Sequence, residues 1–344
     1  MDDEQWRRKI KNFSFDKCKK GNQGFQRILL QLFGYVGHGK SSFINSVICA
    51  WFKTNFKNYA NAAGTDESHT TQRLTYGLTN NIVLVDNRGC ASMSAYESGE
   101  IFAQLGNLLP LDQGVGWSKG FGLADRIVEA EPLVKASDFI IPIFVYSVKN
   151  YPTPDLKDEL KKIFKHAQDL TAVIPIVVLT NNNHPNYKEI TNMFTDIGTD
   201  KIFALENYTE KSPRRKVETD SAVIRFLYEV IGYAEFQAEH RQDPDQEMME
   251  RKWFVLKFIH ERELKTQTQN LQREIDKQKA NMEQEAKKRE EEEGKMLQKI
   301  REQYQEKEKE MQQQFERERL RKQYEHEQRM KELEKKIGKN GRRK

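Results

Sequence analysis

The sequence predicts an α/β fold, with a mostly parallel sheet that carries helices on both faces, followed by a long charged helix or coiled coil. Between residues 27 and 240, short apolar runs alternate with helical patterns, as in strands joined by crossover helices. The last 100 residues contain three glycines and no proline, a composition that only a long helix or a disordered tract tolerates. We therefore expect a folded front part and a helical back part.

Composition and charge divide the chain in the same way. Of the 84 residues from 261 to 344, 17 are apolar and 45 are charged, whereas 18 of the 19 phenylalanines precede this tail. Residues 1–260 hold 32 basic and 32 acidic side chains, so the net charge of +5 belongs to the tail. Because charges of both signs alternate along the tail, the sequence does not support a nucleic-acid partner.

About six apolar runs in the front part are expected to form the strands of the sheet. They occupy residues 27–33, 74–78, 82–85, 139–146, 173–179 and 202–205. Between them, Thr153-Pro154 offers a cap and a first-turn proline for one helix, and Asp220 offers a cap for another. Residues 1–26 are expected to be a short extension that docks on this domain.

A glycine-rich segment directly after the first apolar run matches the P-loop of phosphate-binding NTPases. Residues Gly34 to Ser41 carry glycines, a lysine and a hydroxyl at the required positions, and a helical pattern follows at once. Backbone amides would curl around a β-phosphate, an exposed Lys40 would reach the β- and γ-phosphate oxygens, and the Ser41 hydroxyl would ligate Mg²⁺. The expected nucleotide contacts are Gly34, Gly37, His38, Gly39, Lys40, Ser41 and Ser42. A chance glycine-rich turn is the alternative.

A second phosphate element is expected where the run at 82–85 ends. Asp86 and Gly89 form a DxxG pattern about 45 residues after the P-loop, so Asp86 would hold Mg²⁺ through water and the Gly89 amide would sense a γ-phosphate. The alternative is an ordinary turn at a strand end. Cys90 stands where many GTPases carry the glutamine that positions water, so hydrolysis is expected to be slow or assisted. Arg88 is either a catalytic cis arginine or a structural cation.

The polar stretch from Gly64 to Thr71 separates these two elements and is a candidate switch loop. Thr70 or Thr71 would complete the Mg²⁺ shell, because both immediately precede the alternating strand at 74–78. The alternative for either threonine is a solvated loop residue without a ligand.

The segment expected to recognise the base follows the run at 173–179. It reads Thr180-Asn181-Asn182-Asn183, where a strict guanine site would carry the pattern Asn/Thr-Lys-x-Asp, and Thr180, Asn181 and Asn183 are the candidate contacts. Aspartate accepts hydrogen bonds from N1 and N2 of guanine, whereas asparagine presents one acceptor and one donor. Either Asn183 reads another edge, or the preference for GTP over ATP is relaxed, or this loop no longer binds nucleotide.

Together these motifs resemble the G-like domain of the interferon-induced protein 44 family. The resemblance spans roughly residues 27–240 and is carried by Gly34–Val47, Asp86–Gly89, Leu179-Thr180 and Phe203–Tyr208. It implies a cytosolic GTP-binding domain of the translation-factor-related GTPase class, associated with innate immune and antiviral responses. Asn183 departs from the aspartate that members commonly have, and the long C-terminal helix lies outside the shared region.

An approximate heptad of apolar residues runs along the charged tail. It comprises Leu264, Leu271, Ile275, Met282, Met296, Ile300, Tyr304 and Met311, with a slip in register after Met282. Two hypotheses fit this pattern: a coiled coil through which the protein self-associates, or a solitary helix held by i,i+4 ion pairs and used as a spacer. We favour self-association, and we expect removal of residues 250–344 to leave a folded, nucleotide-competent monomer.

These expectations divide the chain into an N-terminal extension at 1–26, a P-loop G-like domain at 27–240, a charged helix at 245–337 and a basic end at 338–344. Three cysteines without a close pair, no signal-peptide pattern and no apolar run long enough for a transmembrane segment favour a cytoplasmic location. The expected function is a GTP- and Mg²⁺-dependent switch or assembly factor. The alternatives are a coiled-coil scaffold with a non-cycling G-like domain and an ATP-binding variant.

Overall fold

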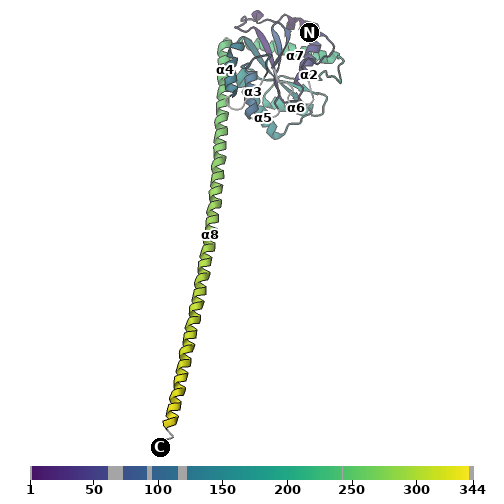
Figure 1. The fold of residues 1–344 in the computed structure, drawn as a ribbon. Helices are drawn as coiled ribbons and strands as arrows, with labels where there is room; N and C mark the ends of the chain where they lie inside the picture. Colours follow the sequence, from purple (N-terminus) through teal and green to yellow (C-terminus); the bar gives the residue numbers. More distant parts are fainter. Residues whose placement is uncertain (1, 61–72, 91–94, 115–121, 242, 341–344) are drawn as a thin grey trace. The chain divides into compact units, whose positions relative to one another are not determined.

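The computed structural model describes residues 2–60, 73–90, 95–114, 122–241 and 243–340. The chain separates into two compact units, Met1–Lys265 and Thr266–Lys344. The first unit contains a sheet with helices on both sides, and the second consists of the greater part of one helix (Figure 1).

The first unit is built on a six-stranded sheet in the order β2-β3-β1-β4-β5-β6. The strands are β1 (Arg27–Phe33), β2 (Leu74–Thr79), β3 (Ile82–Asp86), β4 (Asp138–Ser147), β5 (Ile176–Thr180) and β6 (Ile202–Leu205). All neighbours pair in parallel except β2, which runs antiparallel to β3 at the edge of the sheet. The α/β class and the mostly parallel sheet are therefore confirmed, and the carboxyl ends of the five parallel strands lie together.

Helices cover both faces of this sheet. They are α1 (Asp3–Lys11), α2 (Lys40–Phe52), α3 (Ala95–Leu105), α4 (Gly122–Ala130), α5 (Pro154–Thr171), α6 (Tyr187–Ile197), α7 (Val217–Ala238) and α8 (Pro244–Asn340). Helices α1, α2 and α7 share one hydrophobic cluster with the sheet, whereas α3 to α6 and the first turns of α8 share another. Each cluster closes one face of the sheet.

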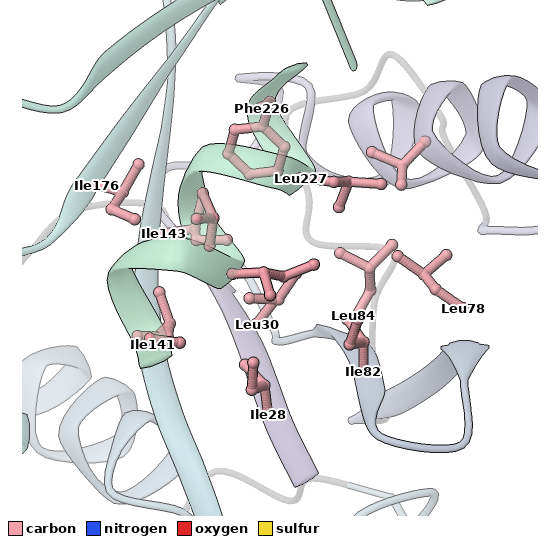
Figure 2. Packing of buried hydrophobic residues seen from close by; sticks show 14 of the residues in the cluster. Ile28, Leu30, Leu78, Ile82, Leu84, Ile141, Ile143, Ile176, Phe226 and Leu227 are labelled. Carbon is pink, nitrogen blue, oxygen red and sulfur yellow. The ribbon is translucent and has the colours of Figure 1, made fainter. Parts of the chain in front are cut away.

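The strands supply side chains to both clusters because successive residues point to opposite faces. Figure 2 shows Leu30 of β1, Leu84 of β3 and Ile143 of β4 near Phe226 and Leu227 of α7. On the opposite face, an aromatic ring of β1 packs against one of β4, and rings of β4 pack against rings of α5 and α6. Burial of a large apolar side chain stabilises the folded state by about 1.5–3 kcal/mol relative to leaving it exposed. This packing holds in place the strand ends that carry the candidate site.

The N-terminal extension docks on the first unit through α1. Trp6 stacks on Tyr228 of α7 with ring centroids 5.8 Å apart. The guanidinium of Arg7 donates to the main-chain oxygens of Ala50 and Trp51, each at 2.9 Å, near the C-terminus of α2. A cation in this position satisfies the last carbonyls of a helix and interacts favourably with its dipole. The extension therefore stabilises the helix that follows the glycine-rich loop.

The first turns of α8 also belong to the first unit. Val255 and Ile259 are buried in the cluster that contains α3 and α5. Arg251 is buried as well and donates to a main-chain oxygen directly after α3 at 3.1 Å. Removal of residues 250–344 would take these side chains out of the core, so a truncation that preserves the first unit has to end at Lys265.

Within the second unit, α8 is a charged helix, which confirms the predicted long C-terminal helix. Ion pairs at i,i+4 spacing include Glu318–Lys322 at 2.9 Å and Arg321–Glu325 at 3.1 Å. Its apolar side chains from Leu271 to Leu333 are exposed. Among the residues that the structure describes, none of the helices combines the length and the apolar character that a membrane span requires.

Some element boundaries differ from the prediction. β5 begins at Ile176 instead of residue 173, because Pro175 directly precedes it and lacks the N–H that a central strand needs. Asp220 does not cap a helix: α7 begins at Val217, and Asp220 lies in its first turn, where it accepts a hydrogen bond from the Tyr208 hydroxyl at 2.8 Å. Helices α1, α3, α4 and α6 were not predicted.

Candidate functional site

The glycine-rich loop predicted to bind phosphate joins β1 to α2. Gly34 has a φ of +138°, and a Cβ at this residue would lie 2.6 Å from the main-chain oxygen of Val145, so only glycine fits. Helix α2 begins without a side-chain cap and without an acidic residue in its first turn. The first N–H groups of α2 are therefore left for an anion in the loop.

Lys40 is enclosed by this loop, whereas the sequence predicted an exposed side chain. Its ammonium donates to the main-chain oxygens of Gly34 at 3.2 Å and Tyr35 at 2.8 Å, and the side chain is buried. Burial lowers the pKa of Lys40, while the nearby Asp86 carboxylate acts in the opposite direction. A buried cation held by two neutral carbonyls is poorly compensated, so an anion in the loop would be favoured.

Ser41 and Asp86 meet where α2 begins and β3 ends. The Ser41 hydroxyl donates to Asp86 Oδ2 at 2.9 Å. The other carboxylate oxygen, Oδ1, is buried and has no hydrogen-bond partner in the described part of the chain. Desolvation raises the pKa of Asp86 to about 6, while Lys40 and the Ser41 hydroxyl act to lower it. A hydroxyl and a carboxylate with an unpartnered oxygen are hard donors of the kind that Mg²⁺ prefers.

The protein provides only part of a metal shell at this place. Over the described residues, the structure holds no group of three His, Cys, Asp or Glu side chains that could bind a metal ion. Ser41 and Asp86 fit Mg²⁺ only together with water and phosphate oxygens, which is how Mg²⁺ is held in nucleotide sites.

Asp86→Asn should remove the contribution of Mg²⁺ to nucleotide affinity without destabilising the ligand-free protein. The raised pKa means that the ionised carboxylate is disfavoured in the folded chain, and an amide of the same shape carries no charge to desolvate. We expect the affinity measured with Mg²⁺ to fall at least about 10-fold, to the value without metal, because the negative charge that would hold the metal through water is lost. Titration with and without Mg²⁺ and thermal unfolding measure both effects. An unchanged Mg²⁺ effect in the variant would contradict the metal role of Asp86.

The turn that follows β3 is hydrogen bonded to the glycine-rich loop. Val36 N–H donates to Cys90 O at 2.9 Å, and Tyr35 and Cys90 pair as an isolated parallel bridge. A Cβ at Gly89 would lie 2.6 Å from the Lys40 ammonium, so a side chain there would push the ammonium off its carbonyls. Gly89 is thus beside the lysine, where a γ-phosphate sensor is expected.

A network of buried polar side chains supports the same turn. Arg73, which directly precedes β2, donates to Asn87 Oδ1 at 2.9 Å and to Gln31 Oε1 at 3.1 Å. Asn87 donates to the same Gln31 oxygen at 2.8 Å. The main-chain N–H of Arg88 donates to Gln104 Oε1 of α3 at 3.1 Å. The candidate catalytic Arg88 is therefore part of a turn that is fixed to α3, and its catalytic role stays a prediction.

His38 anchors the glycine-rich loop to the end of β4. Its Nδ1 accepts a hydrogen bond from Ser147 N–H at 3.3 Å, and its Nε2 lies 2.7 Å from the side-chain amide of Asn150. The ring packs against Tyr35 and Tyr146, with centroids 5.2 Å and 4.7 Å away. Burial lowers the pKa of His38 to about 3, so the ring is neutral at physiological pH. The ring of His38 is therefore engaged with the protein, and a contact of this residue with a nucleotide stays a prediction.

The ends of β5 and β6 are fastened to the glycine-rich loop. The Thr180 hydroxyl donates to His38 O at 3.0 Å, and Asn207 Nδ2 donates to Gly39 O at 3.3 Å. Asn181 has a φ of +58° and donates to the hydroxyl at the end of β4 at 3.0 Å. The segment expected to recognise the base thus lies against the loop expected to hold the phosphates.

Three further candidate residues are not shown in a contact with the glycine-rich loop. Asn183 is exposed, and its main-chain N–H donates to Glu206 Oε1 at 3.1 Å. Thr70 and Thr71, the candidate switch threonines, lie outside the described residues. Sequence analysis assigned no role to Ser147 or Glu206, although polar residues at the end of a parallel strand are a usable signal for a site.

Comparisons with known protein families and with curated proteins find no match for this chain. The resemblance to the interferon-induced protein 44 family stays a hypothesis, and the function has to follow from the geometry of the site.

Proposed function

We propose that the first unit binds GTP with Mg²⁺ at the Gly34–Ser41 loop and acts as a nucleotide-dependent switch or assembly factor. The observation that carries the proposal is the convergence of Lys40, Ser41 and Asp86 at the uncapped amino terminus of α2. A buried ammonium, free helix N–H groups and a hydroxyl–carboxylate pair are the elements by which proteins bind the phosphates and magnesium of a nucleoside triphosphate.

Each residue would have its own role. Lys40 would exchange its two loop carbonyls for phosphate oxygens, which gives the buried ammonium the negative partner that it lacks. The first N–H groups of α2 would donate to the phosphates, and Ser41 and Asp86 would orient Mg²⁺, which neutralises phosphate charge when bound. The Gly89 amide would respond to a γ-phosphate because this residue adjoins the Lys40 ammonium.

Weak or assisted hydrolysis fits this site best. Cys90, which follows Gly89, is buried, and the Val36 side chain lies 3.3 Å from the position of a Cβ at Gly89. Neither side chain can orient a water molecule by accepting its proton. Arg88 is the candidate cation for stabilising charge during phosphoryl transfer. The same observation favours a second function, that of a scaffold whose G-like domain binds nucleotide without cycling.

Calorimetric titration of the full chain tests the proposal. GTP, GDP, ATP and a nonhydrolysable GTP analogue are each titrated with and without Mg²⁺, and phosphate release is measured in parallel. We expect GTP and its analogue to bind alike, and both to bind more tightly with Mg²⁺. If none of the four nucleotides binds, the proposal is rejected. If nucleotide binds but no phosphate is released, the scaffold function is favoured.

The second unit supports self-association as part of this function. The apolar side chains of Leu271, Ile275, Ile300, Tyr304 and Met311 are exposed on a charged helix. The first two are four residues apart, and the last three follow one another at spacings of four and seven residues. Such a pattern is typical of a seam that a second copy of the chain covers. The resemblance given above suggests a cytoplasmic protein of innate immune or antiviral responses, in which nucleotide state would control assembly.

Removal of residues 266–344 should convert a self-associating protein into a folded monomer that still binds nucleotide. The apolar seam is lost with these residues, while the buried turns of α8 are kept. Light scattering measures mass separately from hydrodynamic radius. We expect the mass to rise with protein concentration for the full chain and to stay constant for the truncated chain. A full-length control with Ile300→Glu should behave like the truncated chain. A monomeric mass of the full chain at every concentration, with or without nucleotide, would leave the helix as a spacer.

A further inference from the structure

Glu206 directly follows β6, and its half-buried carboxylate lies beside the segment that follows β5. Its Oε1 accepts a hydrogen bond from Asn183 N–H at 3.1 Å, while its Oε2 accepts none from the residues that the structure describes. The next residue, Asn207, donates to Gly39 O of the glycine-rich loop at 3.3 Å. The carboxylate is therefore carried by the residue that precedes Asn207 in the sequence, and Asn207 directly contacts the loop that we assign to the phosphates.

The other polar side chains of the segment after β5 are already engaged or poorly suited to read a base. The Thr180 hydroxyl donates to the glycine-rich loop, Asn181 donates to the end of β4, and Asn182 Oδ1 is buried. Asn183 is exposed and presents one acceptor and one donor. Across residues 180–183 and 205–208, the sequence contains one carboxylate, that of Glu206.

A carboxylate at this place distinguishes guanine from adenine. Guanine presents two donors along its edge, N1–H and N2–H, whereas adenine presents a lone pair at N1. An ionised carboxylate accepts hydrogen bonds and donates none, so it pairs with guanine and opposes the adenine lone pair.

We infer that Glu206 recognises the base and gives this chain a preference for guanine over adenine, supplying from the end of β6 the carboxylate that the segment after β5 lacks. The inference rests on the proposed nucleotide binding. Asn183 acts as a positioning residue: its N–H holds Oε1, which leaves Oε2 and the second lone pair of Oε1 for the two guanine donors. The preference would then be stronger than Asn183 alone predicts.

The test compares Glu206→Gln with the wild type and with Glu210→Gln, an exposed glutamate four residues further on. The full chain of each variant is titrated with GTP, ATP and xanthosine triphosphate in the presence of Mg²⁺, and its thermal unfolding is recorded. Glutamine presents one acceptor and one donor, which match the N1–H and O2 of xanthine and mismatch guanine. We expect Glu206→Gln to lose about 10- to 100-fold in GTP affinity. Its ATP affinity should rise, because an amide no longer opposes the adenine lone pair, and its affinity for xanthosine triphosphate should rise as well.

The outcomes separate this inference from the proposed function. If the wild type binds GTP but Glu206→Gln keeps the wild-type ratio of GTP to ATP affinity, Glu206 does not recognise the base, and nucleotide binding itself stands. If all three affinities fall together while Glu210→Gln is unaffected, Glu206 is structural and the inference is overturned. If the wild type binds none of the triphosphates, the proposed function fails and the inference fails with it.

Discussion

Lys40→Met should abolish measurable nucleotide binding while the protein stays folded. Methionine keeps the length and apolar stem of lysine but removes the ammonium that would contact the phosphates, so we expect affinity to fall at least about 100-fold. The fold tolerates the change because the same substitution removes a buried charge, and the oxygens of Gly34 and Tyr35 that lose the ammonium still accept hydrogen bonds from the N–H groups of Cys90 and His38, each at 3.4 Å. The free energy of unfolding should stay within about 1 kcal/mol of the wild type.

Lys53→Met is the matched control for this variant. Lys53 lies at the other end of α2, where it pairs with Glu4 at 2.5 Å, and its side chain is about half exposed. An exposed ion pair contributes little, so neither nucleotide affinity nor stability should change measurably. Wild-type affinity in Lys40→Met, with the wild type binding GTP, would show that nucleotide does not bind at the glycine-rich loop.

Much of the fold could be predicted from the sequence because the strands are buried. Strands covered on both faces have nearly continuous apolar runs, so β1, β3 and β4 were placed within one or two residues of their bounds. The start of α5 was also predicted, and the Thr153 hydroxyl accepts a hydrogen bond from Leu156 N–H at 3.3 Å. Helix α6 was missed because Tyr187–Ile197 contains two threonines and an asparagine, whose low helix propensity hides its apolar face.

The candidate site was predictable only where its residues are close in sequence or follow a strand. The glycine-rich loop and the DxxG turn both meet that condition, and Ser41 and Asp86 are in contact. Lys40 was placed correctly along the chain, but its enclosure by loop carbonyls depends on the path of the loop, which spacing does not define. The partners of His38 lie 109 and 112 residues away, so only the packing of β4 beside β1 could reveal them.

Arg73 is the most consequential residue that sequence analysis did not identify. It is fully buried and donates to five acceptors: Asn87 Oδ1, Gln31 Oε1, Asn107 Oδ1 and the main-chain oxygens of Gln104 and Leu109. Desolvation lowers the pKa of Arg73 to about 9, which leaves it charged at neutral pH. The guanidinium fork is well suited to this task because its five N–H groups diverge in one plane.

Arg73→Met should therefore reduce the free energy of unfolding of the first unit by about 2–4 kcal/mol. Each buried acceptor left without a donor costs about 1–3 kcal/mol, and relief of the desolvated charge offsets part of that sum. Arg73→Lys keeps the charge but offers three donors from one atom, so its loss should be intermediate. Denaturant unfolding followed by tryptophan fluorescence reports this unit alone, because all 4 tryptophans precede residue 261.

Arg225→Met is the control for the loss of an arginine at the surface, since Arg225 forms an exposed i,i+4 pair with Glu229 at 2.7 Å. This variant should change the free energy of unfolding by less than about 0.5 kcal/mol. An equal, small effect of Arg73→Met and Arg225→Met would show that the buried network is not what holds the turn after β3. Nucleotide should stabilise both variants, because a ligand that binds only the folded state adds a term that grows with the logarithm of its concentration relative to its Kd. A smaller stabilisation of Arg73→Met than of Arg225→Met at the same nucleotide concentration would connect the buried arginine to the turn that carries Asp86 and Gly89, since that turn receives the Arg73 hydrogen bond through Asn87.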